Sequence, residues 1–249
     1  MRRVVCLLAA LAGVTACLAL ALGWFQSQST PAVSPVVTGR AGTLILDAGH
    51  GGEDGGAVSI TGQPESQINL AIVHKLDDLL ALYGTAPILL RSEDVSLHSG
   101  DAVTAREKKV SDLKNRVAAI QAAGDGATLL SIHQNSFPEG KYRGTQAFFA
   151  PTEGSQELAL HIQNTIKARL QPDNNRACKP IPDTVYLMNH VDCRAVLVEC
   201  GFLTNPEEEA LLRDEGYQRK LAAVLTAAWL TAGTRPGGPG LAPSAGLIP

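Results

Sequence analysis

The stretch Leu44-Ile45-Leu46-Asp47-Ala48-Gly49-His50-Gly51-Gly52 decides the fold of this chain. It begins as an apolar run of the length of a buried strand and passes directly into a glycine-rich turn that contains a histidine. In open α/β sheets, ligands bind at the edge formed by the carboxyl ends of the strands. The turn has neither a G-x-G-x-x-G pattern nor a G-K-[ST] ending, so it does not indicate a nucleotide site. The stretch therefore predicts a strand that ends in a functional loop.

Outward from this strand, apolar runs bounded by turn residues predict further strands, and amphipathic patterns between them predict helices. The expected strands cover 43–47, 86–91, 127–133, 145–150, 184–188 and 195–200. The expected helices are one that begins at Glu65, then 112–123, 155–170 with Ser155 as its N-cap, 206–213 and 217–232. This alternation predicts a single α/β domain, with a mixed, mainly parallel sheet of about six strands and helices on both faces.

The two ends of the chain do not have the pattern of a folded domain. Residues 4–25 carry no charged side chain and follow Arg2 and Arg3, so residues 1–25 can form an uncleaved membrane anchor. A cleaved signal peptide and a lipoprotein cleavage box at Cys17 are the competing interpretations. All three place the protein outside the cytoplasm. Residues 26–40 then form a polar tether, 41–233 the domain, and 234–249 a disordered tail rich in proline and glycine.

Charge and cysteine content exclude several classes. The formal net charge is −3 and no dense block of lysine and arginine occurs, which argues against a nucleic-acid partner. Two of the five cysteines lie in the N-terminal apolar segment, which leaves Cys178, Cys193 and Cys200 in the domain. Because three is an odd number, no complete disulfide framework is indicated; a Cys178–Cys193 bridge and free buried thiols both remain open.

Three residues have the types and positions of metal ligands. His50 follows the first strand, and His133 ends the strand expected at 127–133. Glu65 follows a proline at the start of a helix, where the helix dipole alone would favour an acid by roughly 0.3–1 kcal/mol. Each residue viewed alone also fits a structural role. Because strand ends in an α/β sheet meet at one edge, the three side chains can converge on one point.

Glu199 is a fourth candidate residue of the site. It ends an otherwise apolar strand, where a buried carboxylate is costly unless it has a partner or a raised pKa. Two imidazoles and one carboxylate match an open, catalytic type of zinc site, and a second carboxylate nearby can act as general base. Other divalent ions also fit mixed nitrogen and oxygen ligands. The remaining histidines are expected to be structural or solvated, and no G-x-S-x-G turn indicates a covalent mechanism.

These segments together resemble the zinc-dependent N-acetylmuramoyl-L-alanine amidases of type 3. The motifs that carry the resemblance are Asp47-Ala48-Gly49-His50-Gly51-Gly52, Glu65, Ser131-Ile132-His133-Gln134-Asn135, and Val198-Glu199-Cys200-Gly201-Phe202-Leu203-Thr204-Asn205-Pro206. The resemblance covers about residues 43–232 and implies a mixed-sheet α/β fold. It also implies one zinc ion held by His50, Glu65 and His133, a catalytic Glu199, and peptidoglycan as substrate. Ala48, Gln134, Cys200 and Thr204 depart from the residues usual in that family, and none of them is a ligand.

The expected reaction is hydrolysis of the amide between N-acetylmuramic acid and L-alanine. A zinc carboxypeptidase or deacetylase acting on cell-wall peptides or glycans would use the same ligand types, and a non-catalytic wall-binding module is a further alternative. Residues 108–116, 141–144 and 170–176 also resemble the amidase branch that prepares spore cortex for muramic-δ-lactam formation. That resemblance implies a role in sporulation and germination, while the residues leave open whether an activating partner protein is needed.

Overall fold

The computed structural model describes residues 42–124 and 126–232. The expected membrane or signal segment, the tether and the C-terminal tail lie outside these residues. The strands are β1 (Leu44–Ala48), β2 (Ile88–Leu89), β3 (Thr128–Asn135), β4 (Gln146–Phe149), β5 (Lys179–Pro180) and β6 (Arg194–Phe202). The helices are α2 (Glu65–Leu82), α3 (Ala105–Ala122), α4 (Ser155–Arg169), α5 (Tyr186–Asn189), α6 (Pro206–Arg213) and α7 (Glu215–Thr231).

The strands form one mixed sheet in the order β2-β1-β3-β6-β4-β5. The four strands β2, β1, β3 and β6 run parallel, whereas β4 pairs antiparallel with β6 and β5 runs parallel to β4. The carboxyl ends of β1, β3 and β6 therefore meet at one edge of the sheet, which is where α/β proteins bind their ligands. This confirms the predicted α/β class and the mainly parallel sheet.

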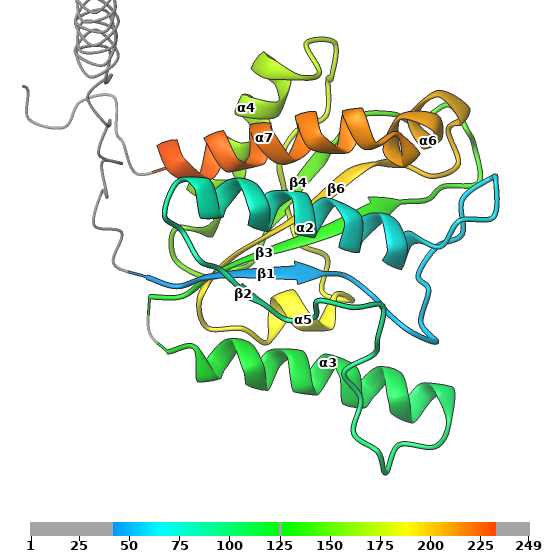
Figure 1. Ribbon diagram of the computed structural model, residues 1–249, viewed down its shortest axis with the longest axis vertical. Coiled ribbons are helices and arrows are strands. Elements are labelled where there is room, and N and C mark those ends of the chain that lie inside the picture. Colours follow the sequence, from blue (N-terminus) through cyan, green and yellow to red (C-terminus); the bar gives the residue numbers. More distant parts are fainter. Residues whose placement is uncertain (1–41, 125, 233–249) are drawn as a thin grey trace, which may run out of the picture. The chain divides into compact units, whose positions relative to one another are not determined.

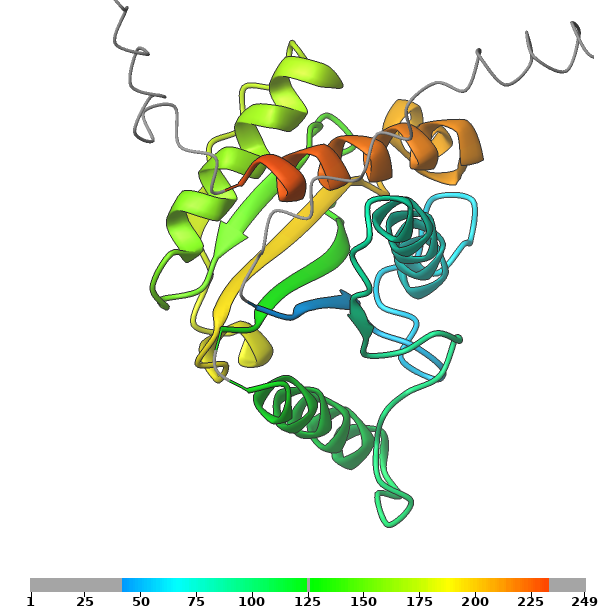
Figure 2. The same cartoon turned by 60° about the vertical axis from the view of Figure 1, so that its left-hand side comes forward.

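Helices cover both faces of the sheet (Figure 1). Helices α2, α4 and α7 pack on one face, and α3 and α5 lie on the other, an arrangement that both views show (Figure 2). The strand residues alternate accordingly. Leu44 and Leu46 belong to the core under α2 and α7, whereas Ile45 belongs to the core under α3 and α5. Since side chains along a strand alternate between faces, Asp47 of β1 and His133 of β3 lie on the side of the sheet that α3 covers.

Several predicted elements need correction. The expected strand at 184–188 is wrong, because Tyr186–Asn189 forms a helical turn that buries Leu187 and Met188. Short apolar runs do not distinguish a strand from a buried helical turn. The strand that the sequence does not predict is β5, Lys179–Pro180, whose two exposed residues give no apolar pattern.

Two helix starts also differ from expectation. Helix α3 begins at Ala105 rather than residue 112, because Thr104 and Glu107 form a capping box. The run of charged residues that follows hides this start from a search for apolar periodicity. Ser155 is not an N-cap: Gly154, with φ 74°, holds that position. The Ser155 hydroxyl instead accepts a hydrogen bond from the backbone of Ala195 at 2.9 Å and so joins α4 to β6.

The cysteines of the described part of the chain are free. Cys178 and Cys193 are half-buried and do not form the disulfide that the sequence allowed, while Cys200 is buried. Burial raises the pKa of the Cys200 thiol far above its ordinary value, so the thiol stays protonated. Within residues 42–124 and 126–232, no helix combines the length and the apolar character needed to cross a bilayer.

Candidate metal centre

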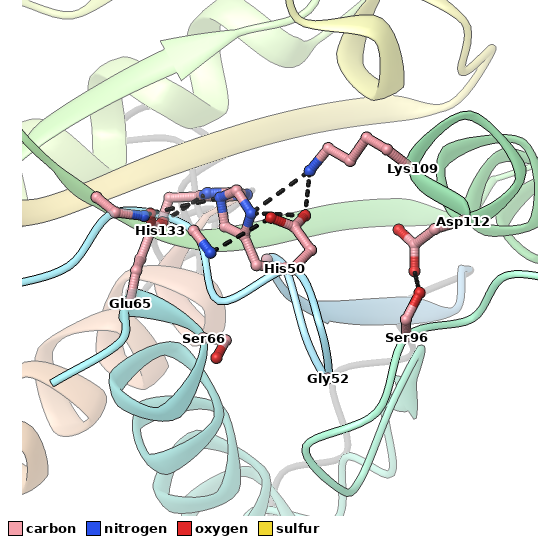
Figure 3. Close-up of polar contacts among 12 residues, drawn as sticks. His50, Gly52, Glu65, Ser66, Ser96, Lys109, Asp112 and His133 are labelled. Atoms are coloured by element: carbon pink, nitrogen blue, oxygen red, sulfur yellow. Dashed lines mark hydrogen bonds and ion pairs between the residues drawn. The ribbon is translucent and has the colours of Figure 1, made fainter. Parts of the chain in front are cut away.

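Three side chains from three different elements converge at the carboxyl edge of the sheet (Figure 3). His50 lies in the loop after β1, Glu65 is the first residue of α2, and His133 lies near the end of β3. Each residue offers one donor atom, and these three atoms lie within 4.8 Å of one another. The two imidazole rings meet edge to face, with centroids 5.1 Å apart. The residues expected to be metal ligands are therefore brought together.

Glu65 is the central acceptor of this cluster. Its Oε1 accepts hydrogen bonds from the backbone N–H of Gln134 at 3.0 Å and from the side-chain amide of Asn69 at 3.2 Å. Burial would raise the pKa of Glu65, but the hydrogen bond and charge of His133, whose Nδ1 lies 2.9 Å from Oε1, lower it to about 2. The carboxyl group is therefore ionised at physiological pH, which is the form a metal ion binds.

His50 is fixed by its own loop. It has φ 63°, the only left-handed conformation of a non-glycine among the described residues. Its Nδ1 lies 3.0 Å from the Oδ2 atom of Asp54, which also forms an ion pair with Lys109. The other ring nitrogen, Nε2, lies 3.4 Å from Oε2 of Glu65. A carboxylate behind a histidine in this way fixes the tautomer that a metal ligand needs.

A buried arginine holds the start of the His50 loop. The Nε of Arg91 donates to the carbonyl of Ala48 at 2.8 Å, and its Nη2 donates to the carbonyl of Gly49 at 3.2 Å. The same Nη2 donates to the carbonyl of Ser66 at 2.8 Å, so one side chain links the loop to the first turn of α2. Arg91 therefore fixes the loop relative to the helix that begins with Glu65.

A second buried arginine, Arg116 of α3, holds the loop from the other face. Its Nη2 donates to the carbonyl of His50 at 2.7 Å. Its charge is balanced by Asp112, 2.8 Å from Nε, and by an ion pair with Asp47 of β1. Burial opposes ionisation of Asp47, but Arg116 keeps the pKa of Asp47 below its ordinary value. The strand, the loop and α3 are thus joined by one charged network.

Two glycines leave the space that the cluster occupies. A Cβ atom on Gly49 would lie 2.1 Å from Nε2 of His133, so the imidazole packs directly on the glycine backbone. A Cβ atom on Gly56, where φ is +70°, would lie 2.6 Å from Oε2 of Glu65 and 2.8 Å from Cδ2 of His50. Larger residues at these positions would displace the side chains of the cluster, so these two glycines serve the site itself.

Glu199 lies beside the cluster with an unsatisfied oxygen. In the parallel β3–β6 pair it is the register partner of His133, so both side chains face the same side of the sheet. Its Oε2 is buried and has no hydrogen-bond partner among the described residues. Burial and the nearby Glu65 carboxylate outweigh the attraction of His133 and raise the pKa of Glu199 to about 7. A carboxyl group with this pKa can both accept and release a proton near neutral pH.

The arrangement fits a metal-assisted hydrolytic site. Two imidazole nitrogens and one carboxylate oxygen form the ligand set of an open site that keeps one position for water or substrate. The ionised Glu65 has the protonation state that such binding requires. His74, His98, His161 and His190 hydrogen-bond elsewhere and do not join the cluster.

Some supporting residues were not identified from the sequence. Asp54 has a usable signal, because it follows His50 by four residues in the same glycine-rich loop. Arg116 also has one, an i,i+4 pairing with Asp112 on a helix. Arg91 and Asn69 have none, since only the folded chain shows which backbone carbonyl or carboxylate each one reaches.

The fold and the site together define a hydrolase class: an α/β domain with a candidate nitrogen- and oxygen-ligated metal centre and an adjacent glutamate whose Oε2 is buried. Within that class, the chain belongs to the N-acetylmuramoyl-L-alanine amidase family, whose model matches residues 44–229. It is therefore a hydrolase of the amide bond between N-acetylmuramic acid and L-alanine in peptidoglycan. The resemblance noted in the sequence is confirmed.

Curated relatives and solved structures agree with this assignment. The germination-specific N-acetylmuramoyl-L-alanine amidase of Bacillus subtilis is 33% identical over 202 residues, covering 80% of this chain and 83% of the relative. The CwlD amidase of Clostridioides difficile, solved in complex with the GerS lipoprotein, is 39% identical with a TM-score of 0.73, covering 78% of this chain and 98% of that one. An N-acetylmuramoyl-L-alanine amidase of Clostridium difficile 630 is 29% identical with a TM-score of 0.65, covering 80% and 100%.

Proposed function

We propose that His50, Glu65 and His133 hold one zinc ion and that Glu199 is the general base and acid of the amidase reaction. The observation that carries the proposal is the convergence of three ligand-type atoms within 4.8 Å beside a buried glutamate whose Oε2 has no partner. When bound, zinc would supply Lewis acidity toward a water molecule and toward the carbonyl oxygen of the substrate. The remaining chemistry is performed by the side chains of this chain.

Glu199 moves the protons. As a carboxylate it accepts a proton from the water that attacks the lactyl carbonyl carbon, and as a carboxylic acid it gives a proton to the amide nitrogen. The C–N bond then breaks, leaving a carboxylate on the lactyl group and a free amino group on L-alanine. The protein thereby releases the stem peptide and leaves the glycan strand intact.

The bond that is cleaved can be read from the products. Muropeptides incubated with the full-length protein and zinc are expected to yield free stem peptides that begin with L-alanine, observed by mass spectrometry. A zinc carboxypeptidase would instead remove a C-terminal residue, and a deacetylase would release acetate. Either of those product sets would contradict the proposed reaction at this site.

We further propose that the enzyme works outside the cytoplasm in the modification of spore cortex. The support is the relation to a germination-specific amidase of Bacillus subtilis and the expected anchor or signal segment at residues 1–25. The CwlD amidase of Clostridioides difficile was solved with the GerS lipoprotein. A partner protein of this kind is therefore part of the proposal for this chain as well.

Asp54 should affect the metal through His50. Asp54→Asn removes the charge that orients the Nδ1 hydrogen, so we expect zinc affinity to fall about 10- to 100-fold. Competition with a chromophoric chelator measures this. Glu53→Gln is the matched control, because Glu53 is exposed and pairs only with Lys108 among the described residues. Equal affinities for the Asp54 variant and the unchanged protein would remove Asp54 from this role.

A further inference from the structure

Arg176, in the loop between α4 and β5, is held rigidly beside the sheet edge. Its Nε donates to the side-chain carbonyl of Gln146 at 2.9 Å, and its guanidinium carbon lies 4.8 Å from the centroid of the Phe202 ring. Its backbone N–H donates to Oδ1 of Asn174 at 2.9 Å. Gln146 in turn donates to the carbonyl of Ala177 at 2.7 Å, which fixes the loop on both sides of the arginine. The guanidinium is thus positioned before any ligand arrives.

The groups that hold Arg176 carry no charge, and the carboxylates of Glu208 and Glu199 act on it only from beyond ion-pair distance. Its hydrogen-bond partner is an amide oxygen and its stacking partner an aromatic ring, and no carboxylate of the described residues lies within ion-pair distance. Its Nη1 forms no hydrogen bond within the described part of the chain. Arg116, by contrast, is balanced by two aspartates. A guanidinium that is held in place and has free N–H donors is the usual protein group for bidentate binding of a carboxylate.

Arg176 lies between the general base and a cavity. Gln146, which holds it, is the register partner of Glu199 in the antiparallel β4–β6 pair, so the two side chains lie on the same side of the sheet. Arg176 also lines a cavity of about 480 Å³. The other walls come from the 170–175 loop, from α6 and from Tyr217 of α7. One side chain therefore connects the site of proton transfer with a space large enough for several residues of a peptide.

Two of the other three charged residues of this cavity, Glu208 and Arg143, are already engaged, and the third, Asp173, is acidic and exposed. Glu208 accepts hydrogen bonds from the backbone N–H groups of Gly144 at 2.7 Å and Phe202 at 2.9 Å. Arg143 is mostly exposed and lies 3.5 Å from the carboxylate of Glu207. Arg176 is thus the charged group of the wall that is both fixed and free to bind an anion.

The chemistry of the substrate supplies that anion. The group that leaves in the reaction is the amino end of a peptide whose later residues carry carboxylates, and Glu199 delivers a proton to that amino end. We propose that Arg176 binds a carboxylate of the stem peptide and that the cavity it lines receives the peptide beyond L-alanine. This inference rests on the proposed role of Glu199, which fixes where the peptide begins. Arg176 would thus determine which stem peptides are cleaved efficiently.

Two muropeptides that differ only in whether the stem carboxyl groups are free or amidated test the inference. The full-length protein is expected to prefer the free acid about 10- to 100-fold in kcat/KM, the range for a hydrogen bond to a charged group. Arg176→Gln should lose that preference and retain its activity on the amidated substrate. Arg176→Lys, which keeps the charge but not the planar fork, should retain part of the preference. Arg219→Gln, which removes an exposed charge paired with Glu215, is the control and should behave as the unchanged protein.

Binding measured without turnover separates this inference from the function on which it rests. In a Glu199→Gln background, calorimetric titration with the free-acid muropeptide should show about 10-fold weaker binding when Arg176→Gln is added. An equal loss of activity on both substrates would show that Arg176 acts at the scissile amide or in folding, and the inference would be wrong while the amidase function stands. The absence of any preference in the unchanged protein would overturn it equally. If the unchanged protein releases no stem peptide from either substrate, the proposed function fails, and the titration still decides whether Arg176 binds the carboxylate.

Discussion

Glu199→Gln is expected to reduce the release of stem peptides by a factor of at least about 10² to 10⁴, the contribution typical of a positioned general acid and base. The glutamine has the same shape but can neither accept the proton of the attacking water nor give one to the amide nitrogen. The zinc content should be unchanged, because His50, Glu65 and His133 supply the proposed ligands. Mass spectrometry of the products and metal analysis of the same sample measure both quantities.

The fold should tolerate this substitution. Glutamine keeps the size of the side chain, and the Oε2 atom of Glu199 has no hydrogen-bond partner to lose within the described residues. Thermal unfolding should therefore change little. Glu157→Gln, on the exposed first turn of α4, is the matched control and should retain full turnover. Turnover retained by the Glu199 variant would exclude Glu199 as the general base.

The sequence was sufficient for the architecture because the buried strands are long and apolar. β1, β3 and β6 each contain an apolar run, and a polar residue of the site follows it, His50 in the loop after β1, His133 within β3 and Glu199 within β6. The run at 184–188 has the same composition, yet its residues bury Leu187 and Met188 from a helical turn. Over five residues, composition does not decide between these two conformations; packing does.

The site was predictable only in part, and for a physical reason. Histidines and a glutamate at strand ends or a helix start stand out because charge and polarity are unexpected next to buried strands. His50, Glu65 and His133 lie together as expected, while their binding of zinc and the catalytic role of Glu199 stay predictions. Arg91 could not be identified from the chain, because it acts on backbone carbonyls that any sequence provides.

Arg176, the residue proposed to bind the stem peptide, is likewise not predictable from the sequence. In the sequence it belongs to a loop that resembles one amidase branch, and no feature of that loop connects it to Glu199. The connection depends on the antiparallel pairing of β4 with β6, which places Gln146 opposite Glu199. That pairing joins segments more than fifty residues apart, and a hydrophobic pattern does not specify which strands become neighbours.

Removal of the metal is expected to abolish turnover and to lower thermal stability. Treatment with a chelator should give a folded, inactive protein whose activity returns on addition of zinc. If free zinc exceeds the dissociation constant about 1,000-fold, the metal stabilises the native state by ~4 kcal/mol. For a domain of this size that corresponds to a rise in Tm of roughly 10 °C. Differential scanning calorimetry with and without zinc measures the shift independently of activity.

Substitution of one proposed ligand is expected to have the same effect as removal of the metal. His133→Ala removes one proposed ligand and leaves an uncompensated space on Gly49, where the imidazole packs. Zinc affinity should fall by more than the ~10–100-fold typical for losing a partner behind a ligand, and the zinc-dependent rise in Tm should disappear. His161→Ala is the control, since His161 hydrogen-bonds Thr231 on α7, away from the cluster. Turnover that survives both chelation and loss of His133 would exclude a metal-assisted mechanism at this site.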